Sequence, residues 1–190
     1  PPPTSELPPA ELCVSAIGAT SYYYREATWT QGLQDWLGSH VRAFEYLGGV
    51  PTMVVPDNLK SAVTKACKSD PDINPAYQQL AAHYDTAIVP ARPYKPKDKA
   101  KAEVGVQIIE RWILARLRHH TFFSLHELNQ CINALLTEVN NKPFKQMSGT
   151  RQQWFDELDK PALKQLPRHA YEYTDIRQAK VNIDYHVQYE

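Results

Sequence analysis

The fold class is decided by residues 51–89, which begin Pro51-Thr52-Met53-Val54-Val55-Pro56-Asp57-Asn58 and end Thr86-Ala87-Ile88-Val89. Each end is a short apolar run, which predicts a buried strand. Between them Asn74-Pro75 predicts the start of a helix, because Asn caps helices and Pro is favoured in their first turn. Strand, helix and strand in this order predict an α/β layer with parallel pairing. The first strand would place Asp57 at the carboxyl edge of the sheet.

A hairpin and a long helix are predicted before this unit. Residues 12–17 and 22–24 favour β structure and flank a turn of small residues at 18–21. After Thr30, which we expect to be the N-cap, apolar residues recur at helical spacing until Gly48-Gly49. The layer therefore gains an antiparallel hairpin and an amphipathic helix.

Three more helices and a late strand are predicted after residue 90. A helical apolar pattern covers about residues 98–118, a capping box at Ser124 begins a helix that ends near Asn140, and Thr150 caps a short helix through Leu158. Residues 179–187 alternate like a strand. We expect a linker or truncated edge over residues 1–10, a core over 11–160, and over 161–190 a linker and the first strand of a β-rich module.

Composition excludes several classes of protein. The chain has 190 residues with 21 basic and 21 acidic side chains, and no apolar run approaches the length of a membrane helix. Its three cysteines, Cys13, Cys67 and Cys131, are too far apart for a disulfide framework or a zinc motif, which favours a reducing, cytoplasmic compartment. The sequence contains neither a P-loop, a dinucleotide fingerprint nor a nucleophile elbow, so kinase, dehydrogenase and hydrolase functions lack support.

Positive charge is concentrated in residues 91–120. This window carries a net charge of +5, from Arg92, Lys95, Lys97, Lys99, Lys101, Arg111, Arg116 and Arg118 against three acidic residues. Because the whole chain is neutral, the window is a local electrostatic footprint of the kind that binds phosphates. A solvated basic loop is the alternative interpretation.

Two carboxylates are candidates for a metal site. Asp57 would follow a strand and Glu103 would lie in the first turns of a helix, so both are expected beyond the carboxyl ends of the strands. Two such oxygen ligands suit Mg²⁺ or Mn²⁺, and Lys99 lies one helical turn before Glu103. The alternatives are an ordinary turn at Asp57 and a solvated Lys99–Glu103 pair.

The tryptophans are expected in the core rather than in a binding site. Trp36, Trp112 and Trp154 each fall on an apolar helical face.

Several blocks of the sequence closely resemble IstA-type transposases, which belong to the DDE superfamily of integrases and transposases. The blocks cover nearly the whole chain from Glu11 and are Glu26-Ala27-Thr28-Trp29-Thr30-Gln31, Val54-Val55-Pro56-Asp57-Asn58-Leu59-Lys60, residues 90–103, residues 110–117, and Val181-Asn182-Ile183-Asp184-Tyr185-His186-Val187. The resemblance implies a ribonuclease-H-like core that cleaves element ends and joins the 3′ hydroxyl to target DNA. It also implies that residues 181–187 lead into a small β-barrel.

The resemblance further implies a carboxylate triad that binds two divalent ions. Asp57 matches its second acid and Glu103 its third, while DNA contacts are expected from Asn58, Lys60, Arg92, Lys95, Lys97, Lys99 and Lys101. The first acid belongs on a strand before the predicted hairpin. No residue of this chain matches it, so we expect these 190 residues alone to be inactive.

The implied partners are the DNA of element ends and targets, an AAA+ ATPase helper of the IstB type, and further copies of the chain in the bacterial cytoplasm. Two other functions stay open. One is a degenerate DNA-binding or assembly module without catalysis, and the other is a structure-selective nuclease of the same fold. A purely structural α/β protein would show neither a metal effect on stability nor salt-dependent DNA binding.

Overall fold

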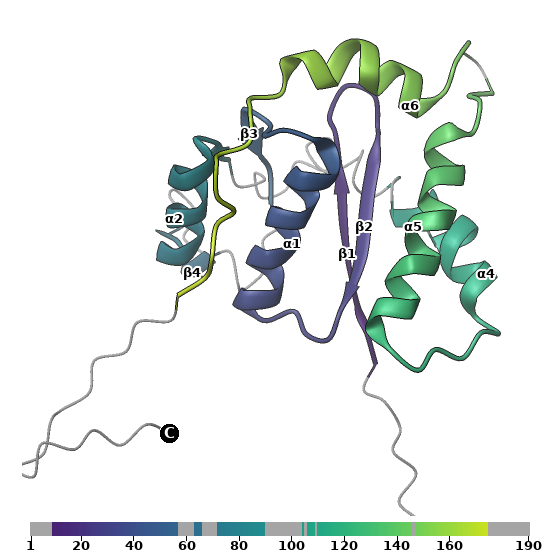
Figure 1. Cartoon of the computed structure of the whole chain (residues 1–190), viewed down its shortest axis with the longest axis horizontal. Helices are drawn as coiled ribbons and strands as arrows, with labels where there is room; N and C mark the ends of the chain where they lie inside the picture. The colour runs from purple at the N-terminus through teal and green to yellow at the C-terminus, as the bar shows by residue number, and fades with distance from the viewer. Residues whose placement is uncertain are drawn as a thin grey trace, which may run out of the picture.

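The computed structural model is a mixed α/β arrangement and describes residues 9–56, 63–65, 72–89, 104, 106–108, 110–145 and 147–174 (Figure 1). The N-terminal half contains β1 (Glu11–Ala16), β2 (Tyr23–Thr28), α1 (Leu33–Leu47), β3 (Met53–Val54), β4 (Val63–Lys65), β5 (Asp72–Ile73), α2 (Pro75–Tyr84) and β6 (Ala87–Ile88). The C-terminal half contains the π-helix η2 (Glu110–Leu114), α4 (Ala115–Leu117), α5 (Leu125–Asn141), α6 (Arg151–Trp154), the π-helix η3 (Phe155–Asp159) and the 3₁₀ helix η4 (Lys160–Ala162).

The predicted hairpin is confirmed. β1 and β2 pair antiparallel from Glu11 opposite Thr28 to Ala16 opposite Tyr23. The backbone N–H of Ile17 donates to the Tyr22 carbonyl at 2.9 Å and closes the turn. The Asp159 carboxylate accepts hydrogen bonds from the backbone N–H (3.2 Å) and hydroxyl (2.5 Å) of Thr20, so a residue of η3 holds the turn in place.

The helix predicted after the hairpin is confirmed, but its N-cap is not the predicted Thr30. The N-cap is Gly32, whereas the backbone N–H and hydroxyl of Thr30 donate to the Asp35 carboxylate at 3.0 and 2.6 Å. At the other end Gly48 has a φ of +71°, the left-handed conformation that glycine adopts without strain. The chain therefore leaves α1 sharply and turns back toward β3.

Strand, helix and parallel strand follow as predicted. β3 and β6 pair in parallel, with hydrogen bonds from Ala87 to Thr52 (3.0 Å) and from Val89 to Val54 (2.9 Å). Asn74 caps α2 by accepting from the Ala76 N–H at 2.9 Å. The predicted burial of the first strand is wrong, because Met53 is 56% exposed. The antiparallel pair β4–β5 was not predicted.

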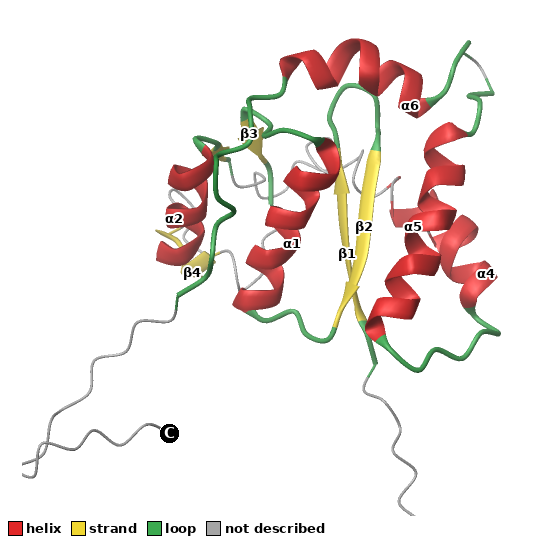
Figure 2. Ribbon diagram, in the orientation of Figure 1, coloured by secondary structure: helices red, strands yellow, loops and turns green. Residues whose placement is uncertain are grey.

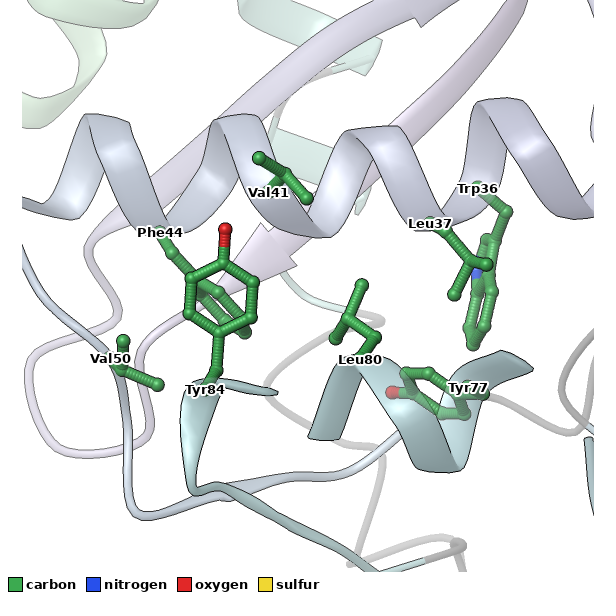
Figure 3. Close-up of a cluster of buried hydrophobic side chains, with 8 residues drawn as sticks. All are labelled: Trp36, Leu37, Val41, Phe44, Val50, Tyr77, Leu80 and Tyr84. Atoms are coloured by element: carbon green, nitrogen blue, oxygen red, sulfur yellow. The ribbon is translucent and has the colours of Figure 1, made fainter. Parts of the chain in front are cut away.

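Two hydrophobic clusters lie on either side of the hairpin. One packs α1 against α2, with Val54 of β3 and Ile88 of β6 at its margin, and is formed by Trp36, Leu37, Val41, Phe44, Val50, Tyr77, Leu80 and Tyr84 (Figure 3). The other packs the opposite face of the hairpin against η2 and α5, through Tyr23, Ala27, Ile113, Ile132, Leu136 and Val139. Helices therefore cover both faces of the hairpin, as Figure 2 shows.

α5 also closes the outer edge of β2 with two asparagine side chains. Asn129 accepts from the N–H of Ala27 (2.7 Å) and donates to its carbonyl (2.9 Å). Asn140 does the same for Tyr23, at 3.1 and 2.8 Å. Two residues of a helix thus replace the partners that a neighbouring strand would supply.

The segment after η4 runs back over the N-terminal half. Lys164 forms a β-bridge with Val50, and its ammonium group contacts the Asp85 carboxylate at 2.6 Å. The N–H of Tyr171 then donates to the Tyr84 hydroxyl at 3.2 Å. The predicted strand at residues 179–187 lies outside the described residues. No described helix is both long and apolar enough to cross a membrane.

Candidate catalytic site

The two predicted metal ligands border segments that the structure describes. Asp57 follows Pro56, which is buried just beyond β3, and Glu103 precedes Val104, which is helical. Both acids lie outside the described residues, as do the predicted DNA contacts at Asn58, Lys60, Arg92, Lys95, Lys97, Lys99 and Lys101. Their positions and roles stay predictions, and the neighbouring scaffold is what the structure describes.

The chain direction places the segment after β3 at a defined end of the molecule. α1 runs back along the hairpin from the end at which β2 finishes, so β3 begins at the opposite end and runs in the direction of β2 (Figure 1). The carboxyl ends of β2 and β3 therefore point to the same end. Asp57 itself lies outside the described residues, so its place at this end stays a prediction.

The strand that leads to Asp57 is fixed on both sides. The Thr86 hydroxyl donates to the Pro51 carbonyl at 2.7 Å, just before the β3–β6 pairing begins. Val54 packs against the cluster beneath α1. Because a metal site needs ligands held in a rigid frame, this support for β3 is compatible with the predicted role of Asp57.

The helix that follows Glu103 is anchored at its far end. Val104 is 51% exposed, whereas Ile108 packs against the cluster on η2 and α5 and Ile113 is fully buried there. Arg25 of β2 is 3% exposed, and its Nε and Nη1 have no hydrogen-bond partner among the described residues. Burial lowers the pKa of Arg25 to about 10, while the negative charge of Glu110 acts in the opposite direction.

A polar groove of about 380 Å³ follows the β2 edge at the end where β2 finishes. It is lined by Tyr24, Glu26, Ala27, Thr28, Trp29, Asp35, Arg42, Leu125, Asn129 and Asn133. Inside it the Arg42 guanidinium donates twice to the Glu26 carboxylate, at 2.7 and 3.0 Å, which raises the pKa of Arg42. Since Glu26 and Asp35 oppose a single arginine, the groove is not suited to phosphate groups.

A second groove, of about 240 Å³, lies between η2, α4 and α5. We call it the Trp112 groove, and it is lined by Trp112, Arg116, Leu135, Glu138, Val139 and Lys142. The Lys142 ammonium lies 3.0 Å from the centre of the Trp112 ring, and the Arg116 guanidinium lies 5.7 Å from it. Arg116 also pairs with Glu138 at 2.6 Å.

The three tryptophans predicted in the core have different surroundings. Trp36 is buried, as predicted. Trp112 is 39% exposed, so its core assignment is wrong, and Trp154 is only partly buried with its ring N–H donating to the Ser148 carbonyl at 3.0 Å. One feature of the sequence pointed to a role for Trp112 outside the core, namely its position in the basic window of residues 91–120. Lys142 is 30 positions later and carried no such signal.

The described residues include no group of three or more histidine, cysteine or acidic side chains that would hold a metal ion. The predicted ligands Asp57 and Glu103 lie outside these residues, and carboxylate oxygens are of the kind that Mg²⁺ and Mn²⁺ prefer.

Comparison with curated proteins gives matches along nearly the whole chain. It is 49% identical over 187 residues to a putative transposase for insertion sequence IS1162 of Pseudomonas fluorescens, which covers 98% of this chain and 33% of the relative. It is 48% identical over 178 residues to a putative transposase for IS408 of Burkholderia multivorans, covering 94% of this chain and 34% of that protein. This chain is similar to part of insertion-sequence transposases. It spans about a third of the length of these relatives, and no family model matches it.

More distant matches extend the same relationship. The transposase for insertion sequence element IS21 of Pseudomonas aeruginosa is 30% identical over 169 residues, covering 87% of this chain and 43% of that protein. Transposases, DNA transposition and mobile elements are therefore the setting in which similar sequences occur.

Solved structures share the fold at low sequence identity. The catalytic core domain of BIV integrase matches with a TM-score of 0.61 at 10% identity, covering 80% of this chain and 89% of that domain. An intasome of simian T-cell lymphotropic virus in complex with PP2A regulatory subunit B56 gamma matches with a TM-score of 0.63 at 14% identity, covering 90% of this chain and 54% of that one. The predicted ribonuclease-H-like, integrase-core fold is thus confirmed, while the β-barrel module is not shown.

Proposed function

We propose that this chain forms most of the catalytic core of a bacterial, IstA-type DNA transposase. The full protein would cleave the ends of a mobile element and join the freed 3′ hydroxyl to target DNA. The observation that carries this proposal is the agreement between two independent matches. Transposases match along 98% of the chain, and integrase catalytic cores match its fold.

In this proposal Asp57 and Glu103 bind the divalent ions. Two such ions activate the attacking oxygen and stabilise the leaving oxygen of a phosphodiester. The parallel β3–β6 pair supports the chain just before Asp57, and Ile108 and Ile113 anchor the helical residues that come after Glu103 in the sequence. Asn58, Lys60 and the basic residues of the 92–101 segment bind DNA phosphates and hold the strand in line.

A third acid would come from an added strand at the open edge of β1. The register directs the N–H and carbonyl groups of Leu12, Val14 and Ala16 away from β2, and within the described residues they have no partner. A strand antiparallel to β1 would run parallel to β3. Its carboxyl end would then lie at the same end of the molecule as Asp57, where a triad requires it.

The proposed partners are the DNA of element ends and target sites, further copies of the chain, and an AAA+ ATPase helper of the IstB type. Assembly of several copies on paired ends is supported by the fold match to an intasome. The bacterial relatives support a bacterial cytoplasmic setting.

The test is a strand-transfer assay with the full-length protein, element-end DNA and Mg²⁺. Asp57→Asn and Glu103→Gln should each lower the rate at least about 100-fold, because each removes about 3 kcal/mol or more of transition-state stabilisation. Binding to element ends should persist. Asp156→Asn is the matched control, since Asp156 is an exposed acid of η3 with only Gln152 and Lys160 as partners.

Strand transfer retained by either variant would refute the assignment of that acid. If the parent protein binds ends without any turnover, the degenerate assembly module becomes the better description. Cleavage of branched DNA without strand transfer would instead identify a structure-selective nuclease.

A further inference from the structure

An exposed indole with two cations above it lies at the junction of η2, α4 and α5. Trp112 projects from η2, Arg116 comes from α4, and Lys142 directly follows the end of α5. Leu135 and Val139 form the apolar floor of this Trp112 groove. Because three elements contribute to it, the groove depends on the tertiary fold and not on a single helix.

The charges in the groove are not balanced. Its one acid, Glu138, is already paired with Arg116 at 2.6 Å. Lys142 has no carboxylate partner in the part of the chain that the structure describes, and its ammonium group rests on the Trp112 ring. Two further exposed cations, Arg118 and Lys145, follow Arg116 and Lys142 within three residues. The surface around Trp112 therefore carries an excess of positive charge, which favours the binding of an anion.

This combination matches the backbone of DNA better than a small apolar ligand. A phosphate pairs with Lys and Arg, while the deoxyribose next to it presents a flat apolar face that an indole covers. The groove combines an apolar lining with the charged side chains of Arg116 and Lys142, as expected for a surface that contacts both sugar and phosphate. It also continues the basic window of residues 91–120, which contains Trp112 and Arg116.

We propose that the Trp112 groove is a separate contact for duplex DNA, with Lys142 and Arg116 on phosphates and Trp112 against the sugar between them. It rests on the proposed function, because DNA is the partner in both cases. It adds a contact in the second half of the core, carried by η2, α4 and the residue that follows α5, and not by the 92–101 segment.

The test measures the affinity of the full-length protein for a labelled duplex of random sequence at several salt concentrations between about 50 and 200 mM. The background carries Glu103→Gln so that no DNA is cut. Lys142→Gln should weaken binding several-fold and lower the salt slope by about one, the value for one phosphate contact. Trp112→Ala should weaken binding without changing the slope.

Matched controls separate this contact from general charge and folding. Lys160→Gln removes one exposed lysine that, like Arg116, is paired with an acid, and it should leave affinity and slope unchanged. Trp112→Phe keeps an aromatic face and should retain most of the affinity. Its DNA-induced quenching of tryptophan fluorescence should be smaller than that of the parent.

Parent-like affinity and slope in both Lys142→Gln and Trp112→Ala, with parent-like melting temperatures, would overturn this proposal. The proposal would also be overturned if polyglutamate, but not DNA, quenched the fluorescence of Trp112, because that result would indicate an acidic protein partner. Neither result would contradict the proposed function. That proposal would be contradicted by a different result, namely strand transfer that survives Asp57→Asn.

Discussion

The hairpin of β1 and β2 has two outer edges, and described residues bond two positions of the β2 edge, which α5 flanks (Figure 2), but none of the β1 edge. On the β2 side, Asn129 and Asn140 satisfy the outward N–H and carbonyl groups of Ala27 and Tyr23. On the β1 side, the corresponding groups of Leu12, Val14 and Ala16 have no partner among the described residues.

This difference between the two edges of the hairpin indicates which edge is available for pairing with a further strand. An open strand edge is a template for pairing, and proteins usually block edges that must not pair. α5 blocks one edge with amide side chains, which present a donor and an acceptor in the same spacing as a backbone unit. The β1 edge, which no described residue blocks, is therefore the side on which the proposed further strand would extend the sheet.

The largest effect is expected from removing the deeper of the two asparagines. Asn140 is 1% exposed and bonds both backbone groups of Tyr23 as well as the Tyr46 hydroxyl. Asn140→Ala leaves a buried N–H and a buried carbonyl unpaired, so the free energy of unfolding should fall by about 3 kcal/mol. Urea titration of the purified variant beside the parent measures this loss.

A neighbour on the same helix provides the control. Asn141 is exposed, and its side chain donates only to the Thr137 carbonyl of its own helix. Asn141→Ala should change stability by no more than about 0.5 kcal/mol. Equal losses in the two variants would mean that the helix itself, and not the closed edge, needs these residues.

A smaller effect is expected from acid, on the side of the hairpin where the edge is open. His40 of α1 lies between Trp36 and Tyr77, and burial lowers its pKa below the usual value. Because the unfolded chain then takes up the proton first, stability is full above about pH 6.5 and decreases as the pH falls below it. The slope should approach about 1.4 kcal/mol per pH unit.

Denaturation at pH 7.5 and at pH 5.5 tests this expectation. His40→Gln should show a flatter dependence on pH than the parent over this interval. His126→Gln is the control, because His126 is exposed at the start of α5 and bonds Gln130 of the same helix. The same pH response in parent and His40→Gln would show that another group titrates.

The smallest expected effect is a difference in hydrogen exchange between neighbouring amides of β1, which is measured without any substitution. The amides of Cys13 and Ser15 pair with β2 and should exchange slowly, whereas those of Leu12, Val14 and Ala16 should exchange quickly. If a longer form of the protein supplies the proposed strand, the second set should become protected and the first should change little. Uniform protection in the 190-residue chain would contradict the open edge.

Local patterns in the sequence predicted most of the elements. The hairpin, α1, α2 and α5 follow from apolar spacing, Asn74, Ser124 and Gly48, because these signals act within one turn of the chain. Features that depend on distant residues were not predictable. The Asn129 and Asn140 edge bonds span more than a hundred positions, and the exposure of Trp112 depends on where α5 ends.

The candidate site was predictable only as a pair of acids and a basic loop. Asp57 and Glu103 were predicted from their expected places after a strand and within a helix, and from resemblance, and both lie outside the described residues. Their geometry depends on how β3 and the helix before η2 meet, which no local pattern encodes.

The π-helical turn at η2 sets the angular phase of the helix that precedes it. Each residue of an α-helix turns about 100° about the axis, and a π turn inserts one residue into that count. Ile113 is locked in the core below, so the insertion rotates everything upstream, from Ile108 back through Val104, by about a quarter turn. Deleting Arg111 or Trp112 would therefore leave the Ile113 anchor in place and turn the described upstream residues, 104 and 106–108, toward a different neighbour. The π-helical turn η2 therefore determines the direction in which the upstream helical side chains point.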